Sequence, residues 1–91
     1  MEYLSFVRAN LSCDFPKLYH GLSCGKKVGE LQGVIQNEYR DKKDMRDEVR
    51  DKVGEVVFYL TALLDKYDLT LEECMIRNQE ILMKKLPSLR K

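Results

Sequence analysis

The chain has 91 residues, of which 16 are Lys or Arg and 15 are Asp or Glu, so its formal net charge at pH 7 is +1. A chain of this length is expected to form one small domain over residues 1–91, with a limited core that oligomerisation often completes. The balanced charge argues against a nucleic-acid partner, and no apolar run approaches the roughly 20 residues needed to span a bilayer.

The first half of the chain predicts two helices and a connection. Residues 1–10 read as a short helix with Tyr3, Leu4, Phe6 and Val7 on its buried side, and residues 11–17 as a connection. Residues 18–25 are ambiguous because two glycines weaken a helix there. Residues 25–39 form a second, stronger helix with a narrow apolar stripe. In this helix Gly29 and Gly33 lie one turn apart, which is expected to permit close packing of another helix.

The longest amphipathic stretch lies between residues 40 and 68. Asp41 and Asp44 place negative charge near its expected N-terminus, where the helix dipole favours it. Gly54 interrupts its apolar stripe at a cost of roughly 1 kcal/mol against alanine, which predicts a close neighbour at this position. The apolar residues follow the i, i+3, i+4, i+7 spacing of one helix face and are Val49, Val53, Val56, Val57, Leu60, Leu63 and Leu64.

The last helix is expected to start at Thr70 and to stop at Pro87. Thr70 and Glu73 have the T-x-x-E spacing of a capping box. The prediction for the whole chain is therefore an all-α fold, a helical hairpin of two long helices with flanking helices. A second copy is expected to complete a four-helix-bundle core, giving a homodimer or homotetramer.

The cysteines and the start of the chain bear on the compartment. Cys13, Cys24 and Cys74 are widely spaced and odd in number, which predicts reduced thiols. The first residues lack the basic and then apolar layout of a signal peptide. We therefore expect a cytoplasmic protein that has no membrane partner.

Two motifs lie on the two long helices. The first reads KKVGEL over residues 26–31, the second reads KVGEVVFYL over residues 52–60, and NQEIL follows at residues 78–82. In this order they resemble the MazG-like, all-α nucleoside triphosphate pyrophosphohydrolases, which include the dCTP pyrophosphatases. The resemblance covers about residues 20–87. It implies a MazG-like hairpin that cleaves a nucleoside triphosphate to a monophosphate and pyrophosphate with Mg²⁺ or Mn²⁺.

The departures from the family pattern lie at the metal site. The family places carboxylates at four positions, E-x-x-E and E-x-x-D, which here are Lys27, Glu30, Lys52 and Glu55. Two of the four are reversed in charge, so the formal charge of the site falls from about −4 to zero and the attraction for magnesium drops. Ile81 stands where the family has a lysine in its N-x-x-K-L segment, which argues against a phosphate contact there.

Two further residues take their expected role from the resemblance. It assigns nucleotide contacts to Tyr59 on the second long helix and to Asn78 on the last helix. The alternatives are a core or interface tyrosine and an asparagine that caps backbone groups. No catalytic residue is assigned.

Three interpretations of the altered motif stay open. In the first, Lys27 pairs with Glu55 and Lys52 with Glu30, so the site is a structural plug without metal or catalysis. In the second, the lysines contact phosphates directly and the protein binds a nucleotide without cutting it. In the third, shifted carboxylates on one helix face rebuild a metal site and weak activity survives. The metal ligands in that case are Glu30 and Glu55, with Glu48 or Asp51 assisting.

The functional hypothesis is a divergent MazG-like nucleoside triphosphate pyrophosphohydrolase whose activity is impaired by the two lysines. It needs Mg²⁺ or Mn²⁺ if it is active and no cofactor if the site is degenerate. The alternative is a catalytically inactive helical module that binds a nucleotide or another protein. Both lysines are also compatible with charge reversals introduced into an active parent.

Overall fold

The computed structural model describes residues 2–11 and 14–85, and every regular element in these ranges is a helix. The predicted all-α class is confirmed for this part of the chain. Two positions named above, Cys13 and the expected helix stop at Pro87, lie outside the described residues. The helices are α1 (Tyr3–Asn10), α2 (Lys17–Asp41), α3 (Arg46–Asp65) and α4 (Leu71–Lys85).

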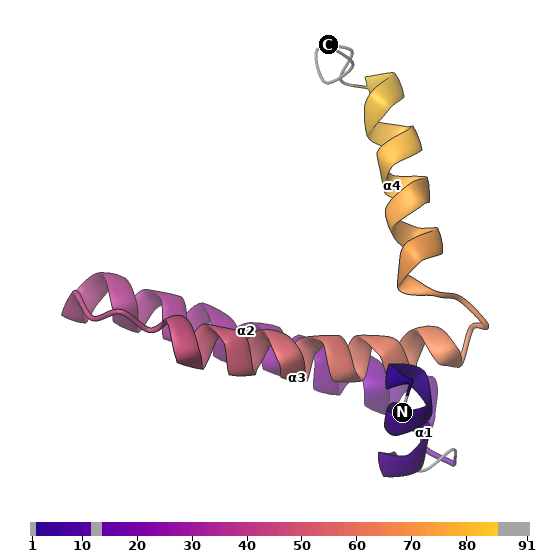
Figure 1. Cartoon of the computed structure of the whole chain (residues 1–91), viewed down its shortest axis with the longest axis horizontal. Coiled ribbons are helices and arrows are strands. Elements are labelled where there is room, and N and C mark those ends of the chain that lie inside the picture. Colours follow the sequence, from indigo (N-terminus) through magenta and orange to yellow (C-terminus); the bar gives the residue numbers. More distant parts are fainter. Residues whose placement is uncertain (1, 12–13, 86–91) are drawn as a thin grey trace.

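The two long helices α2 and α3 lie side by side as a hairpin (Figure 1). The short helix α1 packs against the C-terminal end of α3. Helix α4 leaves the hairpin at a steep angle and extends away from it, so the molecule has the shape of an L (Figure 1). We call the space between α4 and the hairpin the open angle. None of the helices in the described ranges combines the length and the apolarity that crossing a membrane requires.

Helix α2 starts earlier than the sequence indicates. It runs without a break through Gly21 and Gly25, where the prediction was ambiguous. Two contacts explain the difference. The side chain of His20 is buried, and Cys24 Sγ lies 3.9 Å from the backbone oxygen of Val56 on α3. Packing against α3 therefore outweighs the cost of two glycines, which is roughly 1 kcal/mol each.

The predicted bounds of the central helix need two corrections. Asp41 is the last residue of α2, whereas Asp44 does act at the start of α3, because its Oδ1 accepts the backbone N–H of Arg46 at 3.0 Å. Helix α3 ends at Asp65 instead of continuing to Asp68. The chain turns after Asp65, and Asp68 adopts a left-handed conformation with φ 57°.

The expected close neighbours of the glycines are absent. A Cβ atom added at Gly29, Gly33 or Gly54 would meet no atom within 4 Å. The prediction of tight helix packing at these positions is therefore wrong for the described part of the single chain.

The core is small and lies at the corner of the L. Of the residues that the structure describes, only Val7, His20 and Ala62 are buried. They come from α1, α2 and α3 and line one small hollow of about 70 Å³. Tyr3 and Phe6, which were expected on the buried side of the first helix, are 45% and 43% exposed. Of the described residues of α1, Val7 is the one that is buried.

The joint between α3 and α4 is short and well capped. The backbone N–H of Leu69 donates to the carbonyl of Leu64 at 3.0 Å, which closes the end of α3. At the start of α4, Glu73 N–H donates to Thr70 Oγ1 at 3.1 Å and Thr70 N–H donates to Glu73 Oε1 at 3.0 Å. The predicted capping box is confirmed. Hydrogen bonds therefore define the direction in which α4 leaves the hairpin.

Candidate functional site: an ion-pair cluster between α2 and α3

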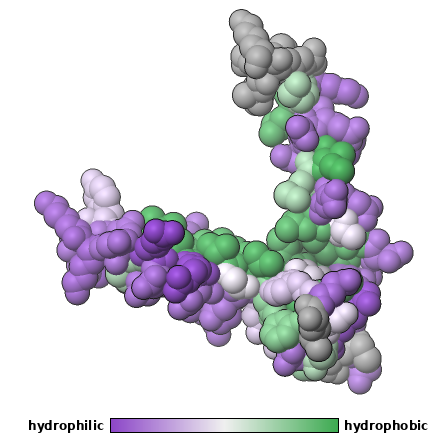
Figure 2. All heavy atoms as spheres, in the orientation of Figure 1, coloured by the Kyte–Doolittle hydropathy of each residue, from purple (hydrophilic) through white to green (hydrophobic). Residues whose placement is uncertain are grey.

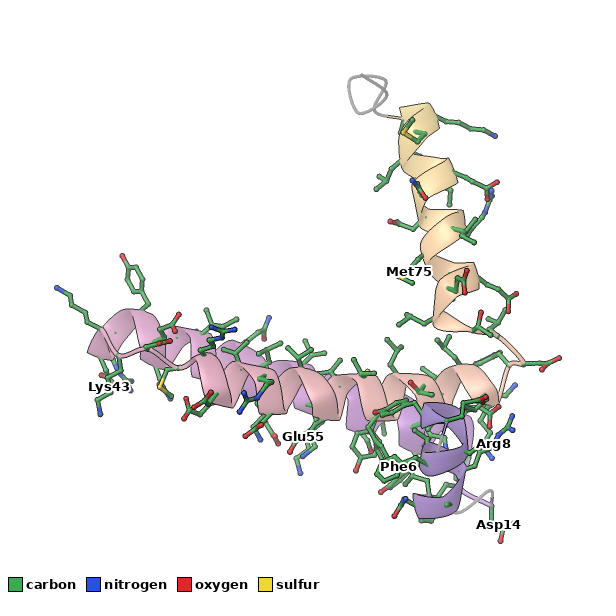
Figure 3. All side chains as sticks on the ribbon, viewed as in Figure 1. Phe6, Arg8, Asp14, Lys43, Glu55 and Met75 are labelled. Carbon is green, nitrogen blue, oxygen red and sulfur yellow. The ribbon has the colours of Figure 1, made fainter. Side chains whose placement is uncertain are left out.

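The four motif residues meet between the two long helices. Lys27 and Glu30 lie one turn apart on α2, and Lys52 and Glu55 lie one turn apart on α3. Residues at i and i+3 share one face of a helix. Because α2 and α3 are neighbours, the two pairs face each other. We call these four residues the ion-pair cluster. Glu55 points from the edge of α3 that lies away from the open angle (Figure 3).

Each lysine of the cluster contacts both carboxylates. Lys52 Nζ lies 2.8 Å from Glu30 Oε1 and 3.2 Å from Glu55 Oε2. Lys27 Nζ lies 3.3 Å from Glu55 Oε2 and 3.5 Å from Glu30 Oε1. The cross-helix pairs that the first interpretation predicts, Lys27 with Glu55 and Lys52 with Glu30, are both present. They are joined by two pairs within the helices, so the four charges form a closed ring.

The ring stabilises the charged form of every member. The hydrogen bond from Lys52 is the main cause that lowers the pKa of both Glu30 and Glu55. The same contacts raise the pKa of Lys52, chiefly through Glu30, and the pKa of Lys27, chiefly through Glu55. All four groups are therefore charged near neutral pH, and the formal charge of the cluster is zero.

The cluster as it stands does not fit a magnesium ion. Magnesium takes oxygen ligands in a near-octahedral shell. Here Glu30 Oε1 and Glu55 Oε2 both accept the ammonium groups of Lys27 and Lys52. A cation between the helices would have to displace two ammonium groups that carry the same sign of charge. Elsewhere in the described residues, no group of three or more His, Cys, Asp or Glu side chains is placed to hold a metal.

The assisting carboxylates of the third interpretation lie at the surface. Glu48 is exposed near the start of α3, and the side chain of Asp51 is 74% exposed. Asp51 Oδ1 lies 3.9 Å from Arg50 Nε, and the pair is open to solvent. Asp51 does share a cleft with Glu55, so it is the nearer of the two to the ion-pair cluster.

An aromatic cleft opens beside the cluster. Its volume is about 400 Å³, and Lys27, Asp51, Gly54 and Glu55 supply its polar and backbone parts. The ring-bearing residues that line it are Tyr3, Phe6, Phe58 and Tyr59. Rings beside a cation can bind a flat ligand that carries negative charge. We call this cleft the aromatic cleft.

Two of the cleft residues could not be assigned to it from the sequence. Tyr3 and Phe6 reach the cleft because α1 docks on α3, and Phe6 in turn contacts the ring of Phe58 edge-on, with the centroids 6.1 Å apart. Apolar spacing in the first ten residues indicates a buried side but does not say which helix it meets. Among the four rings of the cleft, Tyr59 is the one whose position in a sequence motif indicated a site here.

Asn78 lies on a different element from the cleft. It is exposed on α4 and lines a separate hollow with Leu69, Cys74 and Ile81. Within one chain, Tyr59 and Asn78 therefore line different hollows. Cys24 and Cys74 are free thiols.

Comparison with known proteins adds no relative. No protein-family model matches the chain, and neither a curated protein nor a solved structure matches it. The fold and site define an all-α protein in which two antiparallel helices are linked by a ring of four charges. The MazG-like resemblance stays a prediction that rests on the motifs quoted from the sequence.

Proposed function

We propose that the chain is a divergent MazG-like protein in which the ion-pair cluster replaces a magnesium site, so that nucleoside triphosphate pyrophosphohydrolase activity is impaired or absent. The observation that carries this proposal is the contact of Lys27 and Lys52 with both Glu30 and Glu55, at 2.8–3.5 Å. Each carboxylate that the family would offer to a metal already has two cationic partners.

Loss of the magnesium site should impair pyrophosphohydrolase activity, because magnesium has several roles in such a reaction. It screens the triphosphate, polarises the attacked phosphorus and positions water. Lysine ammonium groups can offset phosphate charge, but they provide no ligand that orients a metal-bound water. A site with two lysines and two paired glutamates is therefore suited to holding two helices together.

Pyrophosphate release tests the proposal. The original chain and a Lys27→Glu/Lys52→Glu variant are assayed against canonical ribo- and deoxyribonucleoside triphosphates with Mg²⁺ or Mn²⁺. A Lys43→Glu/Lys84→Glu variant has the same change in net charge at two exposed positions away from the cluster. We expect the original and the control to be inert and the cluster variant to release pyrophosphate. Cleavage by the original chain at the rate of the cluster variant would refute the proposal.

A second candidate function is nucleotide binding without hydrolysis, and the aromatic cleft favours it. A base could stack on Tyr59 or Phe58 while Lys27 meets a phosphate at the end of the same cleft. The thermal unfolding midpoint measured with nucleotide distinguishes the candidates. Stabilisation without metal indicates a binding module, stabilisation that requires Mg²⁺ indicates a surviving metal site, and no stabilisation indicates a structural or interaction role.

A further inference from the structure

Four aromatic side chains line the aromatic cleft, and each ring contacts the next one along a row. The ring centroids of Tyr3 and Phe6 are 6.0 Å apart, and those of Phe6 and Phe58 are 6.1 Å apart. The row ends at Tyr59, whose centroid lies 5.3 Å from that of Phe58. The first two rings come from α1 and the last two from α3, so the docking of two helices places four rings along one cleft.

The angles between these rings suit a rounded group better than a flat one. The planes of Tyr3 and Phe6 are tilted by 33°, those of Phe6 and Phe58 by 71°, and those of Phe58 and Tyr59 by 90°. A nucleic-acid base stacks on a ring that lies parallel to it. A compact group can instead touch several rings that face in different directions. Because the face of an aromatic ring is negative, such a row attracts an organic cation.

The charged groups of the cleft favour the same sign of ligand. They are Lys27, Asp51 and Glu55, so their formal charges sum to −1. The Lys27 ammonium group already contacts Glu55 at 3.3 Å and Glu30 at 3.5 Å, and its charge is balanced within the ion-pair cluster. An anionic ligand would have to compete with both carboxylates for this ammonium group. Asp51 lies outside the cluster and supplies the negative charge that remains.

The carboxylate of Asp51 can still attract a second cation. Its side chain is 74% exposed, and its Oδ1 lies 3.9 Å from Arg50 Nε. Arg50 also contacts Asp47 at 3.4 Å and does not line the cleft. An exposed ion pair of this kind contributes little free energy. Asp51 and Glu55 are four residues apart on α3 and therefore share one face of the helix.

The size and place of the cleft suit a small molecule. Its volume of about 400 Å³ lies within the range of about 300–1,000 Å³ that is typical of ligand sites. Gly54 leaves its wall without a side chain, and a Cβ atom added there would meet no atom within 4 Å. Figure 2 shows apolar surface at the corner of the L, near α1, and hydrophilic surface over the far end of the hairpin. Phe6 and Glu55 lie on the side of α3 away from the open angle (Figure 3).

We propose that the aromatic cleft binds a small organic cation that carries a trimethylammonium group. The methyl groups contact the rings of Phe6, Phe58 and Tyr59, and the Asp51 carboxylate offsets the positive charge. Aromatic rings recognise quaternary ammonium groups in this way. A primary ammonium group is more strongly hydrated and would lose more on entering the cleft. The proposal does not depend on whether the ion-pair cluster excludes a metal.

The first test compares two ligands that differ in one atom. Choline and its neutral carbon isostere, in which carbon replaces the quaternary nitrogen, are titrated into the full chain and followed by NMR. We expect choline to bind about 10-fold more tightly, because only the cation gains from the ring faces and from Asp51. Its methyl protons should show NOEs to the rings of Phe6 and Tyr59. Equal affinity for the isostere, or no binding of choline up to tens of millimolar, would overturn the proposal.

Two substitutions test the residues that carry the proposal. Phe6→Leu keeps an apolar side chain but removes one ring, and should weaken choline binding about 2- to 30-fold. Asp51→Asn removes the charge at the surface and should weaken it about 2- to 5-fold. The matched control is Asp47→Asn, because Asp47 contacts the same Arg50 but does not line the cleft. Circular dichroism checks that all variants keep their helix content. Unchanged binding by Phe6→Leu, or equal loss in both asparagine variants, would overturn the proposal.

Two further ligands test the source and the sign of the charge. A short peptide with one trimethyllysine should bind no more tightly than choline, because the charged groups of the cluster beside the rings are already paired. Tighter binding of the peptide would overturn the assignment to a small molecule in favour of a protein partner. A nucleoside triphosphate that shifts the same ring signals at lower concentration than choline would overturn the proposal in favour of nucleotide binding.

Discussion

Replacing Gly54 by alanine should make the protein more stable. Gly54 lies in the middle of α3, and a Cβ atom added there would meet no atom within 4 Å. Glycine in a helix interior is about 0.8–1.0 kcal/mol less favourable than alanine. Because the added methyl group would meet no atom within 4 Å, this difference should appear almost unchanged in the free energy of unfolding.

The magnitude can be measured in two ways. A gain of about 1 kcal/mol in a domain of this size raises the thermal midpoint by roughly 4–8 °C. In urea, the same gain moves the midpoint by about 0.3–1 M for typical slopes of 1–3 kcal/mol/M. The slope itself should not change. Circular dichroism at 222 nm follows both transitions, since the described chain is helical throughout its regular elements.

Gly25→Ala serves as the matched variant. Gly25 lies inside α2, has equally open space around it and does not line the aromatic cleft. Both substitutions should therefore stabilise the protein by similar amounts. A loss of stability at Gly54 together with a gain at Gly25 would contradict this prediction, because it would mean that another group approaches α3 at Gly54.

Three further outcomes follow from the corner and the joint of the L. Burial and the nearby Lys66 lower the pKa of His20. The free energy of unfolding should therefore be highest above about pH 6.5, the pKa of His in the unfolded chain, and should fall as the pH drops toward the folded pKa. Urea titrations at several pH values measure this, and His20→Gln should flatten the pH dependence between pH 7 and pH 5. Thr70→Ala should weaken the start of α4 by about 1 kcal/mol, seen as faster exchange of the Glu73 amide, and unchanged exchange would contradict the capping role. Arg8→Gln should loosen α1, because its guanidinium holds Asp65 at 2.6 Å; near-ultraviolet circular dichroism should report this, and an unchanged spectrum would contradict the role of the pair.

The sequence allowed correct prediction of features that depend on local spacing. The i, i+3, i+4 pattern indicated the helix that became α3, and T-x-x-E indicated the cap at Thr70. The cross-helix pairs of Lys27 and Lys52 were also predictable. They require only two helices side by side, with charges one turn apart on each.

Structural features that depend on long-range packing could not be predicted from the sequence. Gly21 and Gly25 weaken a helix in isolation, yet α2 continues through them because His20 and Cys24 pack toward neighbouring elements. Tyr3 and Phe6 line the aromatic cleft only because α1 docks on α3. The joint that leads into α4 contains a left-handed residue, Asp68, whose conformation a sequence pattern does not reveal.

The ion-pair cluster should exclude a divalent metal from the place between α2 and α3. Binding of Mn²⁺, followed by electron paramagnetic resonance, tests this directly on the original chain and on the Lys27→Glu/Lys52→Glu variant. The original chain should bind no Mn²⁺ up to millimolar concentration, whereas the variant, which has four carboxylates at these positions, should bind it. If the original chain bound Mn²⁺ as tightly as the variant does, the ion-pair cluster would not exclude the metal.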